Sequence, residues 1–527
     1  MRASSLGLAG ALSLCVLTLA PPTGKAQSRL GTIDFPTSGA PAAQAAFLRG
    51  TALLHSFEYE DAARSFREAQ RLDPGFAMAY WGEAMTYNHP VWNQQDRAAA
   101  RAALGRLGPT PEARKARAPT AREQAYLETL EVLYGEGSKP HRDTLYAAAM
   151  ERLVSAYPED DEARAFYALA LLGLGQGNRD LWSYMRAAAV AQPVFERNPN
   201  HPGAAHYLIH SFDDPTHAPL GLKAARAYSG IAPDAAHAQH MTSHIFVALG
   251  MWDDVVAANE QAMRVTERQL GRSPVGCRHY NEWLAYGYLQ QGRVRDAARL
   301  VEECRADVER QRGAAGSLER MRAIYLVDSR DWQGAISRIP VDSASQPAWA
   351  RTARDFTDGL GALARGDVTG AEVALNRVVA RRARGSGVDG NDEVVERTLR
   401  AAVLYAKGQR EAALAEVEQA AALEESLPFE FGPPASYKPP RELLGELLLQ
   451  LDRPADAVRA FGQALRRTPE RAATLLGLAR ASAQAGDAAA AVATYRQLKA
   501  IWHRADPGYG PLAEAENYLT RHLSERP

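Results

Sequence analysis

The chain has 527 residues, of which 46% are hydrophobic, with 61 basic and 62 acidic side chains. This length is too great for one compact core, so it predicts several domains or an extended array of repeats. The formal net charge of -1 excludes a strongly basic nucleic-acid-binding protein. Only 8% of the residues are aromatic, and the abundance of Ala, Leu and Arg favours helix over sheet.

Residues 1–26 have the pattern of a cleaved signal peptide. Arg2 supplies a positive start, Leu6 to Ala20 form a short apolar stretch, and the segment ends in Gly24-Lys25-Ala26, a small-x-small cleavage site. No later segment is apolar enough to span a bilayer. We therefore expect an exported protein, periplasmic or secreted, with no membrane span. In that compartment Cys277 and Cys304 can either form a disulfide or remain two separate buried thiols.

Small residues and prolines recur along the chain with a period of about 34 residues. The clearest copies, at residues 43–76 and 438–471, share five spaced positions: Gly50, Ala62, Phe66, Ala69 and Pro74 in the first, and Gly445, Ala457, Phe461, Ala464 and Pro469 in the second. This spacing resembles the tetratricopeptide repeat (TPR) superfamily. Two antiparallel helices approach closely only where Gly or Ala faces Ala, and Pro ends the second helix. Weaker copies start near residues 77, 127, 161, 202, 236, 278, 316, 352, 394 and 472.

The resemblance implies an all-α, TPR-type α-solenoid, a right-handed superhelix of about a dozen helical hairpins. Turns within the hairpins are predicted at glycines able to adopt a left-handed conformation: Gly175, Gly250, Gly292, Gly366 and Gly408. Loops are predicted at Gly105 to Arg122 and at the Pro-rich segment 426–440. The domain prediction is a signal peptide at 1–26, an N-terminal solenoid at 27–425 carrying a histidine cluster at 201–286, the loop at 426–440, and a C-terminal TPR pair at 441–527.

Histidines are concentrated in the middle of the chain. Of 13 in total, eight lie between positions 201 and 279: His201, His206, His210, His217, His237, His240, His244 and His279. Two pairs in this group have the spacing H-x-x-x-H: His206 with His210, and His240 with His244. On a helix, this spacing places the two imidazoles of a pair one turn apart on the same face. That spacing lets two ligands converge on one metal ion.

The two pairs are themselves separated by one full repeat, and so occupy matching places in consecutive units. In the TPR family these places face the concave groove, so the resemblance implies four imidazoles in one pocket. The next unit places Glu282 and Tyr286 at the equivalent positions, as candidate catalytic or supporting groups. His237 and His279 occupy a further groove-facing position and are second-choice ligands.

Three other interpretations compete with a metal site. The pairs can be ordinary helix histidines, a repeat duplication can have copied one pair, or uncharged imidazoles can bind a carboxylate or phosphate. Two pairs in matching register, together with His237 and His279 on the same face, favour metal coordination. Imidazole-rich sites suit a transition metal such as Zn, Cu or Fe, and six ligands also allow two ions.

Other polar groups are interpreted as structural. His55 and His89, again one repeat apart, lie among aromatic residues, which favours packing between hairpins, although a closed superhelix would make this patch a wall opposite the histidine cluster. Asp213 and Asp214 fall near an expected turn and are predicted to cap a helix or lie in a solvated loop. Signatures of zincins, P-loops, Rossmann folds and α/β-hydrolases are absent from the sequence.

The sequence thus predicts an exported, bacterial-type TPR protein with a histidine-lined concave site. The leading hypothesis is transition-metal binding by His206, His210, His240 and His244, in an oxidoreductase, a hydrolase or a protein without catalysis. The alternative is a scaffold that binds a peptide, a protein or a small molecule in its groove. Neither hypothesis involves nucleic acid.

Overall fold

The computed structural model describes residues 29–340, 346–385 and 390–523, so the predicted signal peptide lies outside the described residues. Helices make up almost all of the regular structure, and the only strands among the described residues are the two-residue β1 (Asn88–His89) and β2 (Gln94–Gln95), which pair antiparallel. In the first half the α-helices are α1 Pro41–His55, α2 Tyr59–Leu72, α3 Ala77–Met85, α4 Arg97–Leu107, α5 Pro111–Lys115, α6 Ala121–Leu133, α7 Lys139–Ala156, α8 Asp161–Gly173, α9 Leu181–Arg197, α10 Pro202–Phe212, α11 Ala218–Ile231, α12 Ala236–Ala248 and α13 Trp252–Leu270. They continue as α14 His279–Gln290, α15 Val294–Glu309, α16 Ala315–Ser329, α17 Ala348–Ala364, α18 Val368–Ala383, α19 Gly390–Ala406, α20 Arg410–Ser426, α21 Pro440–Gln450, α22 Pro454–Arg467, α23 Ala472–Gln484, α24 Ala488–Ile501 and α25 Gly510–Leu523. Short 3-10 helices occur at Pro90–Trp92 and Ile336–Arg338.

The predicted repeat positions explain how neighbouring hairpins pack. Phe66 of α2 lies against Gly50 of its own hairpin and Gly82 of the next, where an added Cβ would come within 2.9 and 2.3 Å of the ring. Phe461 of α22 occupies the same place between Gly445 and Gly477, 2.7 and 2.4 Å from the corresponding Cβ positions. One buried ring therefore holds three helices together, and the glycines provide the space for it.

The turn glycines are predicted correctly at four of five positions. Gly250, Gly292, Gly366 and Gly408 have positive φ angles of 67°, 70°, 78° and 79°. Gly175 does not, because α8 ends in a longer turn whose left-handed residues are Gln176 and Gly177, at φ 52° and 84°.

Two predicted segments differ from the structure. The unit starting near residue 316 lacks a second α-helix, because α16 is followed by the 3-10 helix at Ile336–Arg338 before α17 begins. The loop expected at Gly105 to Arg122 is partly helical, since α4 continues to Leu107 and α5 occupies Pro111–Lys115. Thr110 and Thr120 cap the helices that follow them by accepting hydrogen bonds from Ala113 N and Glu123 N.

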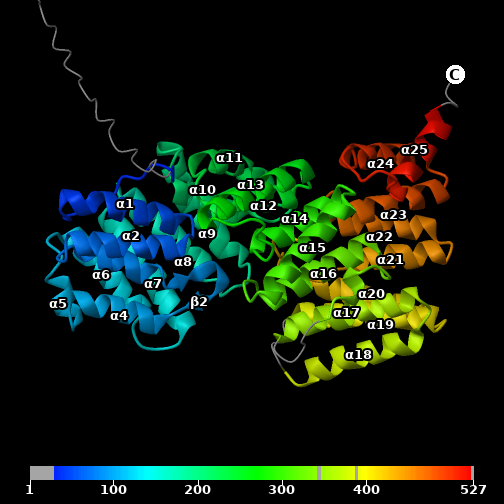
Figure 1. Ribbon diagram of the computed structural model, residues 1–527, viewed down its shortest axis with the longest axis horizontal. Helices are drawn as coiled ribbons and strands as arrows, with labels where there is room; N and C mark the ends of the chain where they lie inside the picture. Colours follow the sequence, from blue (N-terminus) through cyan, green and yellow to red (C-terminus); the bar gives the residue numbers. More distant parts are fainter. Residues whose placement is uncertain (1–28, 341–345, 386–389, 524–527) are drawn as a thin grey trace, which may run out of the picture.

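The path of the chain brings distant repeats together (Figure 1). The α1–α9 block lies at one end, α10–α16 form the centre, and the chain then turns through α17–α20 so that α21–α25 lie beside the central helices. At the N-terminal side, Thr32 N donates to Asn200 O at 2.9 Å. At the C-terminal side, Trp252 Nε1 donates to Glu470 O at 2.8 Å and Trp502 Nε1 donates to Gln290 O at 3.0 Å. The central repeats are thus enclosed from both sides.

A buried ionic network fixes the return of the C-terminal repeats. Arg471, which precedes α23 and is 1% exposed, donates to Asp328 Oδ2 of α16 at 3.1 Å and to Glu442 Oε2 of α21 at 2.9 Å. Lys438 donates to Glu442 Oε1 at 2.8 Å. Removing one partner would leave an uncompensated buried charge, so this network specifies where the C-terminal repeats dock.

Residues 427–439 contain no helix or strand, as predicted for the Pro-rich loop. A hydrophobic core nevertheless continues past this loop, because Ala401 and Val417 share a cluster with Leu443 and Phe461. Cys277 and Cys304 are joined by a disulfide, which ties the segment before α14 to α15. None of the helices within the described ranges is long and apolar enough to cross a membrane.

Candidate metal centre

The histidines singled out from the sequence form one continuous cluster. His206 and His210 project from α10, and His240 and His244 from α12, with His237 at the start of α12 and His279 at the start of α14. Neighbouring ring centroids are 4.9 Å apart for His206 and His210, 5.4 Å for His210 and His244, 5.1 Å for His240 and His244, and 4.8 Å for His240 and His279. The repeat register therefore brings both H-x-x-x-H pairs together.

Each of three histidines donates one ring hydrogen to a group that can only accept it. His206 Nδ1 lies 2.6 Å from His55 O, and His244 Nδ1 lies 3.1 Å from Asp213 Oδ2. His240 Nδ1 lies 2.7 Å from Asn259 Oδ1, and the amide orientation is fixed because Asn259 Nδ2 donates to Val255 O at 2.8 Å. The neutral rings therefore carry hydrogen on Nδ1 and a lone pair on Nε2.

Two of these lone pairs face each other. His240 Nε2 and His244 Nε2 are 3.3 Å apart, yet both Nδ1 atoms already carry the hydrogen, so no hydrogen bond between neutral rings joins them. A tetrahedral ion with bonds of about 2.0–2.1 Å to nitrogen separates two of its ligands by about 3.3 Å. The observed spacing is that of two ligands of one cation.

Four further ring nitrogens are buried without a hydrogen-bond partner among the described residues: His206 Nε2, both nitrogens of His210, and His237 Nε2. Buried polar atoms are normally satisfied, because leaving one without a partner costs about 1–3 kcal/mol. Their concentration on one group of converging side chains points to a ligand that would accept their lone pairs.

Burial favours the uncharged form of His206, His237, His240 and His244 by lowering the pKa of each ring. Desolvation lowers the pKa of His206, His237 and His240 well below the ordinary value, and the neighbouring imidazoles add to the effect. For His244, desolvation lowers the pKa to about 4 although Asp213 favours the protonated form. Because a metal must displace a proton from a charged imidazole, rings that are neutral at pH 7 bind it without that cost.

Asp213, predicted to be a cap or a solvated loop residue, is instead a buried member of the site. The side chain is fully enclosed, and Oδ2 lies 3.4 Å from His210 Nδ1 and 3.1 Å from His244 Nδ1. Burial raises the pKa of Asp213, but Arg179 and the two histidines outweigh burial and hold the pKa well below its usual range. Arg179 also donates to Asp214 Oδ2 at 2.6 Å. A carboxylate behind a histidine ligand fixes the tautomer and orientation of the ring.

Aromatic side chains from distant parts of the chain enclose the cluster. Phe57 lies 4.2 Å from His206 between ring centroids, Trp283 lies 4.3 Å from His244, and Phe431 of the 427–439 loop lies 5.2 Å from His244. Of the aromatic patch noted in the sequence, Trp92 contacts His237 at 5.7 Å. Aromatic side chains therefore cover the part of the predicted groove that holds these histidines. Through Trp92, the aromatic patch that includes His89 contributes to this cover.

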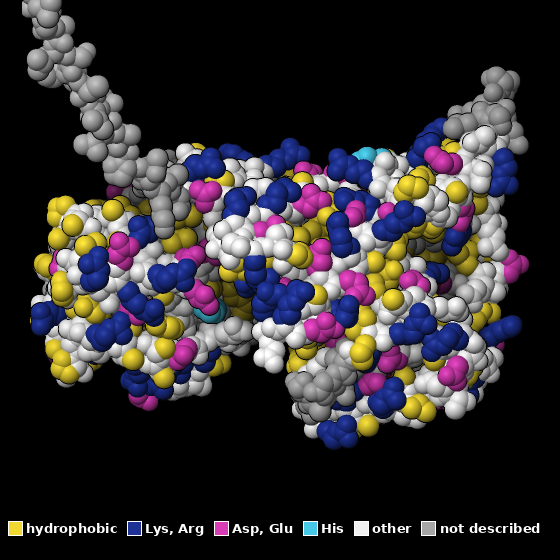
Figure 2. All heavy atoms as spheres, in the orientation of Figure 1, with side chains coloured by type: hydrophobic (Ala, Val, Ile, Leu, Met, Phe, Trp, Pro, Cys, Tyr) yellow, Lys and Arg dark blue, Asp and Glu magenta, His cyan; other side chains and the backbone are white. Residues whose placement is uncertain are grey.

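The cluster reaches water at its edge. His206 and His240 are fully buried and His210 and His244 nearly so, whereas His237 is half-buried and His279 is exposed. Figure 2 shows histidine atoms in a hollow between the N-terminal block and the central helices. Of the six candidate ligands, the two second-choice ones are therefore the most exposed to solvent.

The two candidate catalytic residues, both on α14, make polar contacts with groups outside this cluster. Glu282 is 3.6 Å from Arg320, and burial raises the pKa of its carboxyl group. Tyr286 OH accepts a hydrogen bond from Arg471 at 3.3 Å, in the network that docks the C-terminal repeats. Their surroundings are those of structural ion pairs and hydrogen bonds.

A second group, His55, Glu162 and His201, lies behind the cluster and is fully satisfied. Glu162 contacts His55 Nε2 at 2.7 Å and His201 Nε2 at 3.1 Å, and the remaining ring nitrogens bond to Tyr207 and to Ala204 N. This arrangement supports the structural interpretation of His55. His89 likewise stacks on Tyr59, with ring centroids 3.8 Å apart.

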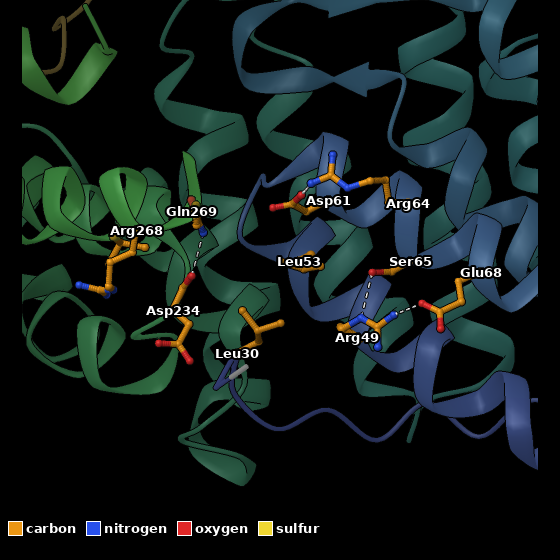
Figure 3. Close-up of a pocket in the computed structure, with 11 residues that line it drawn as sticks. Leu30, Arg49, Leu53, Asp61, Arg64, Ser65, Glu68, Asp234, Arg268 and Gln269 are labelled. Atoms are coloured by element: carbon orange, nitrogen blue, oxygen red, sulfur yellow. Dashed lines mark hydrogen bonds and ion pairs between the residues drawn. The ribbon is translucent and has the colours of Figure 1, made fainter. Parts of the chain in front are cut away.

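A cavity of about 530 Å³ lies between α1–α2 and the end of α13, beside the segment that joins α11 to α12. Figure 3 shows the residues that line it. Most of the charged side chains that line it pair with neighbours, as in Arg49 with Glu68 and Arg64 with Asp61, whereas Arg268 has no ion pair among the described residues. No histidine lines this cavity. Within the described residues it therefore presents one unpaired guanidinium group, Arg268, whereas several unpaired nitrogens converge in the histidine cluster.

Comparison with known proteins identifies the repeats. A family described as tetratricopeptide repeat matches residues 443–509, so this segment carries repeats of that family. Proteins of this class present extended surfaces that bind peptide or protein partners. No curated protein matches the chain.

Solved structures that match the chain at low sequence identity include the following three. The Cut9–Hcn1 hetero-tetramer of the APC/C is 11% identical, with 93% of this chain and 78% of the other covered and a TM-score of 0.35. Human IFIT1 with PPP-AAAA is 13% identical, with 86% and 91% covered and a TM-score of 0.38. Yeast Tom70 is 12% identical, with 92% and 99% covered and a TM-score of 0.27.

Proposed function

We propose that this protein binds a transition metal ion through the histidine cluster between α10, α12 and α14. The observation that carries the proposal is the 3.3 Å separation of His240 Nε2 and His244 Nε2, with both Nδ1 atoms committed to Asn259 and Asp213. Two facing lone pairs repel each other unless a cation lies between them. The buried nitrogens of His206, His210 and His237 add further ligands.

The ligand set selects the class of metal. Imidazole nitrogen suits Zn, Cu or Fe and disfavours Ca and Mg, which take oxygen ligands. The cluster offers no thiolate, because Cys277 and Cys304 are joined to each other. The signal-peptide pattern at residues 1–26 supports export to the periplasm or the exterior, and the disulfide is compatible with that compartment.

Metal content is the direct test. The mature chain is produced in an exporting host and its metal is measured by plasma mass spectrometry, beside His206→Ala/His240→Ala and the control His141→Ala, an exposed histidine of α7. We expect stoichiometric metal in the wild type and the control and a loss of at least ten-fold in the double variant. A wild type that takes up less than a tenth of an equivalent of Zn²⁺, Cu²⁺ or Fe²⁺ would overturn the proposal.

A peptide- or protein-binding scaffold is the second candidate, and the tetratricopeptide repeats at 443–509 favour it. The two functions respond differently to chelation. A partner that is retained equally well by the wild type, the chelated protein and the double histidine variant would support scaffold function without metal. Release of metal without change in partner binding would show that the two functions are separate.

A further inference from the structure

The histidine cluster divides into two groups of three. The ligating atoms of His206, His210 and His237 lie within 4.8 Å of one another, and so do those of His240, His244 and His279. Resting on the proposed metal function, we propose that the site is dinuclear, with one transition metal ion held by each group.

The first subsite, His206, His210 and His237, has nitrogens with nothing else to bind. The Nε2 atoms of all three are buried and have no hydrogen-bond partner within the described part of the chain. His206 is held in place by the hydrogen bond from Nδ1 to His55 O at 2.6 Å. Phe57 packs against all three rings, with centroid distances of 4.2, 5.9 and 5.5 Å. The three rings are thus supported from behind, while their free nitrogens converge.

The second subsite, His240, His244 and His279, is built by a different set of supports. Asn259 and Asp213 hold the Nδ1 atoms of His240 and His244, and the two Nε2 atoms stand 3.3 Å apart. Trp283 packs against all three rings, at 5.0, 4.3 and 5.9 Å. Each subsite therefore has one aromatic side chain that packs against all three of its imidazoles, Phe57 in the first and Trp283 in the second.

One ion cannot satisfy both groups. A tetrahedral ion takes four ligands at about 2.0–2.1 Å, whereas the six imidazoles project from three separate elements and each triad is complete within 4.8 Å. The triads meet where His210 and His244 share Asp213, with Nδ1 to Oδ2 distances of 3.4 and 3.1 Å. A carboxylate between the triads offsets part of the repulsion between two cations.

The arrangement also leaves open positions. Three nitrogen ligands for each ion leave at least one coordination position for water or substrate. The half-buried His237 and the exposed His279 stand on the solvent side, one in each triad. An open position on a transition metal ion that is held by imidazoles accepts water or another small oxygen ligand. The ligand class of this centre is therefore a small oxygen-donor molecule or anion.

Stoichiometry with Co²⁺ and Zn²⁺ tests the inference on the full mature chain. Metal-free protein is titrated with each ion and the bound equivalents are counted for the wild type, His237→Ala, His279→Ala and the control His141→Ala. We expect two equivalents in the wild type and the control and one in each triad variant, with X-ray absorption of the wild type showing a second metal within about 4 Å. Far-UV circular dichroism identifies any variant that fails to fold, and His237→Gln and His279→Gln then replace the alanine variants.

The outcomes separate this inference from the proposed function. One equivalent in the wild type, with no metal neighbour by X-ray absorption, overturns the dinuclear site and leaves metal binding intact. Loss of both equivalents from a single triad variant also overturns it, because the two subsites would then not be separate. No metal at all overturns both the inference and the function on which it rests.

Discussion

At the scale of single residues, the orientation of each imidazole is set by one oxygen atom behind it. Asn259 is completely buried and presents its oxygen to His240, because its own amide hydrogen is taken by Val255 O. Asp213 plays the same part for His244. Such supporting groups typically change metal affinity by about 10–100-fold when removed.

Replacing Asn259 with Leu is expected to lower metal affinity by about 10–100-fold, because His240 would no longer be held with hydrogen on Nδ1. Affinity is measured by competition with a chromophoric chelator. Asn259→Asp is the matched control, since it keeps an acceptor oxygen at the same place and should retain most of the affinity. Equal affinity in wild type and Asn259→Leu would show that this hydrogen bond does not position a ligand.

At the scale of helices, the sequence predicts most of the architecture. The repeat spacing locates the hairpins because the contacts involved, such as Phe461 between Gly445 and Gly477, lie within one or two repeats. It fails at Gly175 and in the unit starting near residue 316, where turn length and a 3-10 helix depart from the repeat. Local periodicity carries no information about such insertions.

Gly477→Ala is expected to destabilise the C-terminal repeats by about 1–3 kcal/mol, because the added methyl group would lie 2.4 Å from the Phe461 ring. Gly462→Ala is the matched control in α22, where the added Cβ meets nothing within 4 Å. That change should stabilise the helix by up to about 1 kcal/mol. Chemical denaturation gives both values, and the same sign for both changes would contradict this packing.

At the scale of the whole molecule, the site joins parts of the chain that sequence reasoning does not connect. The H-x-x-x-H pairs are visible because they share a repeat register, but Asp213, Phe57 and Phe431 carry no spacing signal. Phe431 reaches His244 from several repeats further along the chain, and only the return of the C-terminal repeats brings it there. The burial of Asp213 likewise depends on Arg179, from the preceding hairpin.

The metal-free protein is expected to lose stability as the pH falls from about 6.5 to 4. Burial lowers the folded-state pKa of His206, His237 and His240, and that of His244 to about 4, whereas in the unfolded chain a histidine titrates near 6.5. The unfolded state therefore binds more protons in this range, and the free energy of unfolding decreases with decreasing pH. His244 alone would contribute about 3 kcal/mol.

Urea denaturation between pH 7.5 and 4.5 measures this dependence. His244→Gln, which does not titrate, should have a shallower dependence than the wild type, and the exposed-site control His141→Ala should have the wild-type slope. A free energy of unfolding that stays constant across this range would contradict the burial of neutral histidines.

The loop at 427–439 has a consequence for the order in which the site is assembled. The backbone oxygen of His55 that orients His206 is synthesised early, the imidazoles follow between residues 206 and 279, and Phe431 is made last. Docking of the C-terminal repeats through Arg471 can only follow the synthesis of residue 471. Until then the histidines lie in an unfinished, open solenoid, and contacts this distant in sequence form slowly. Under the proposed metal function, an ion has access to all the histidines during this interval, whereas in the finished protein only His237 and His279 of the two triads are even partly exposed.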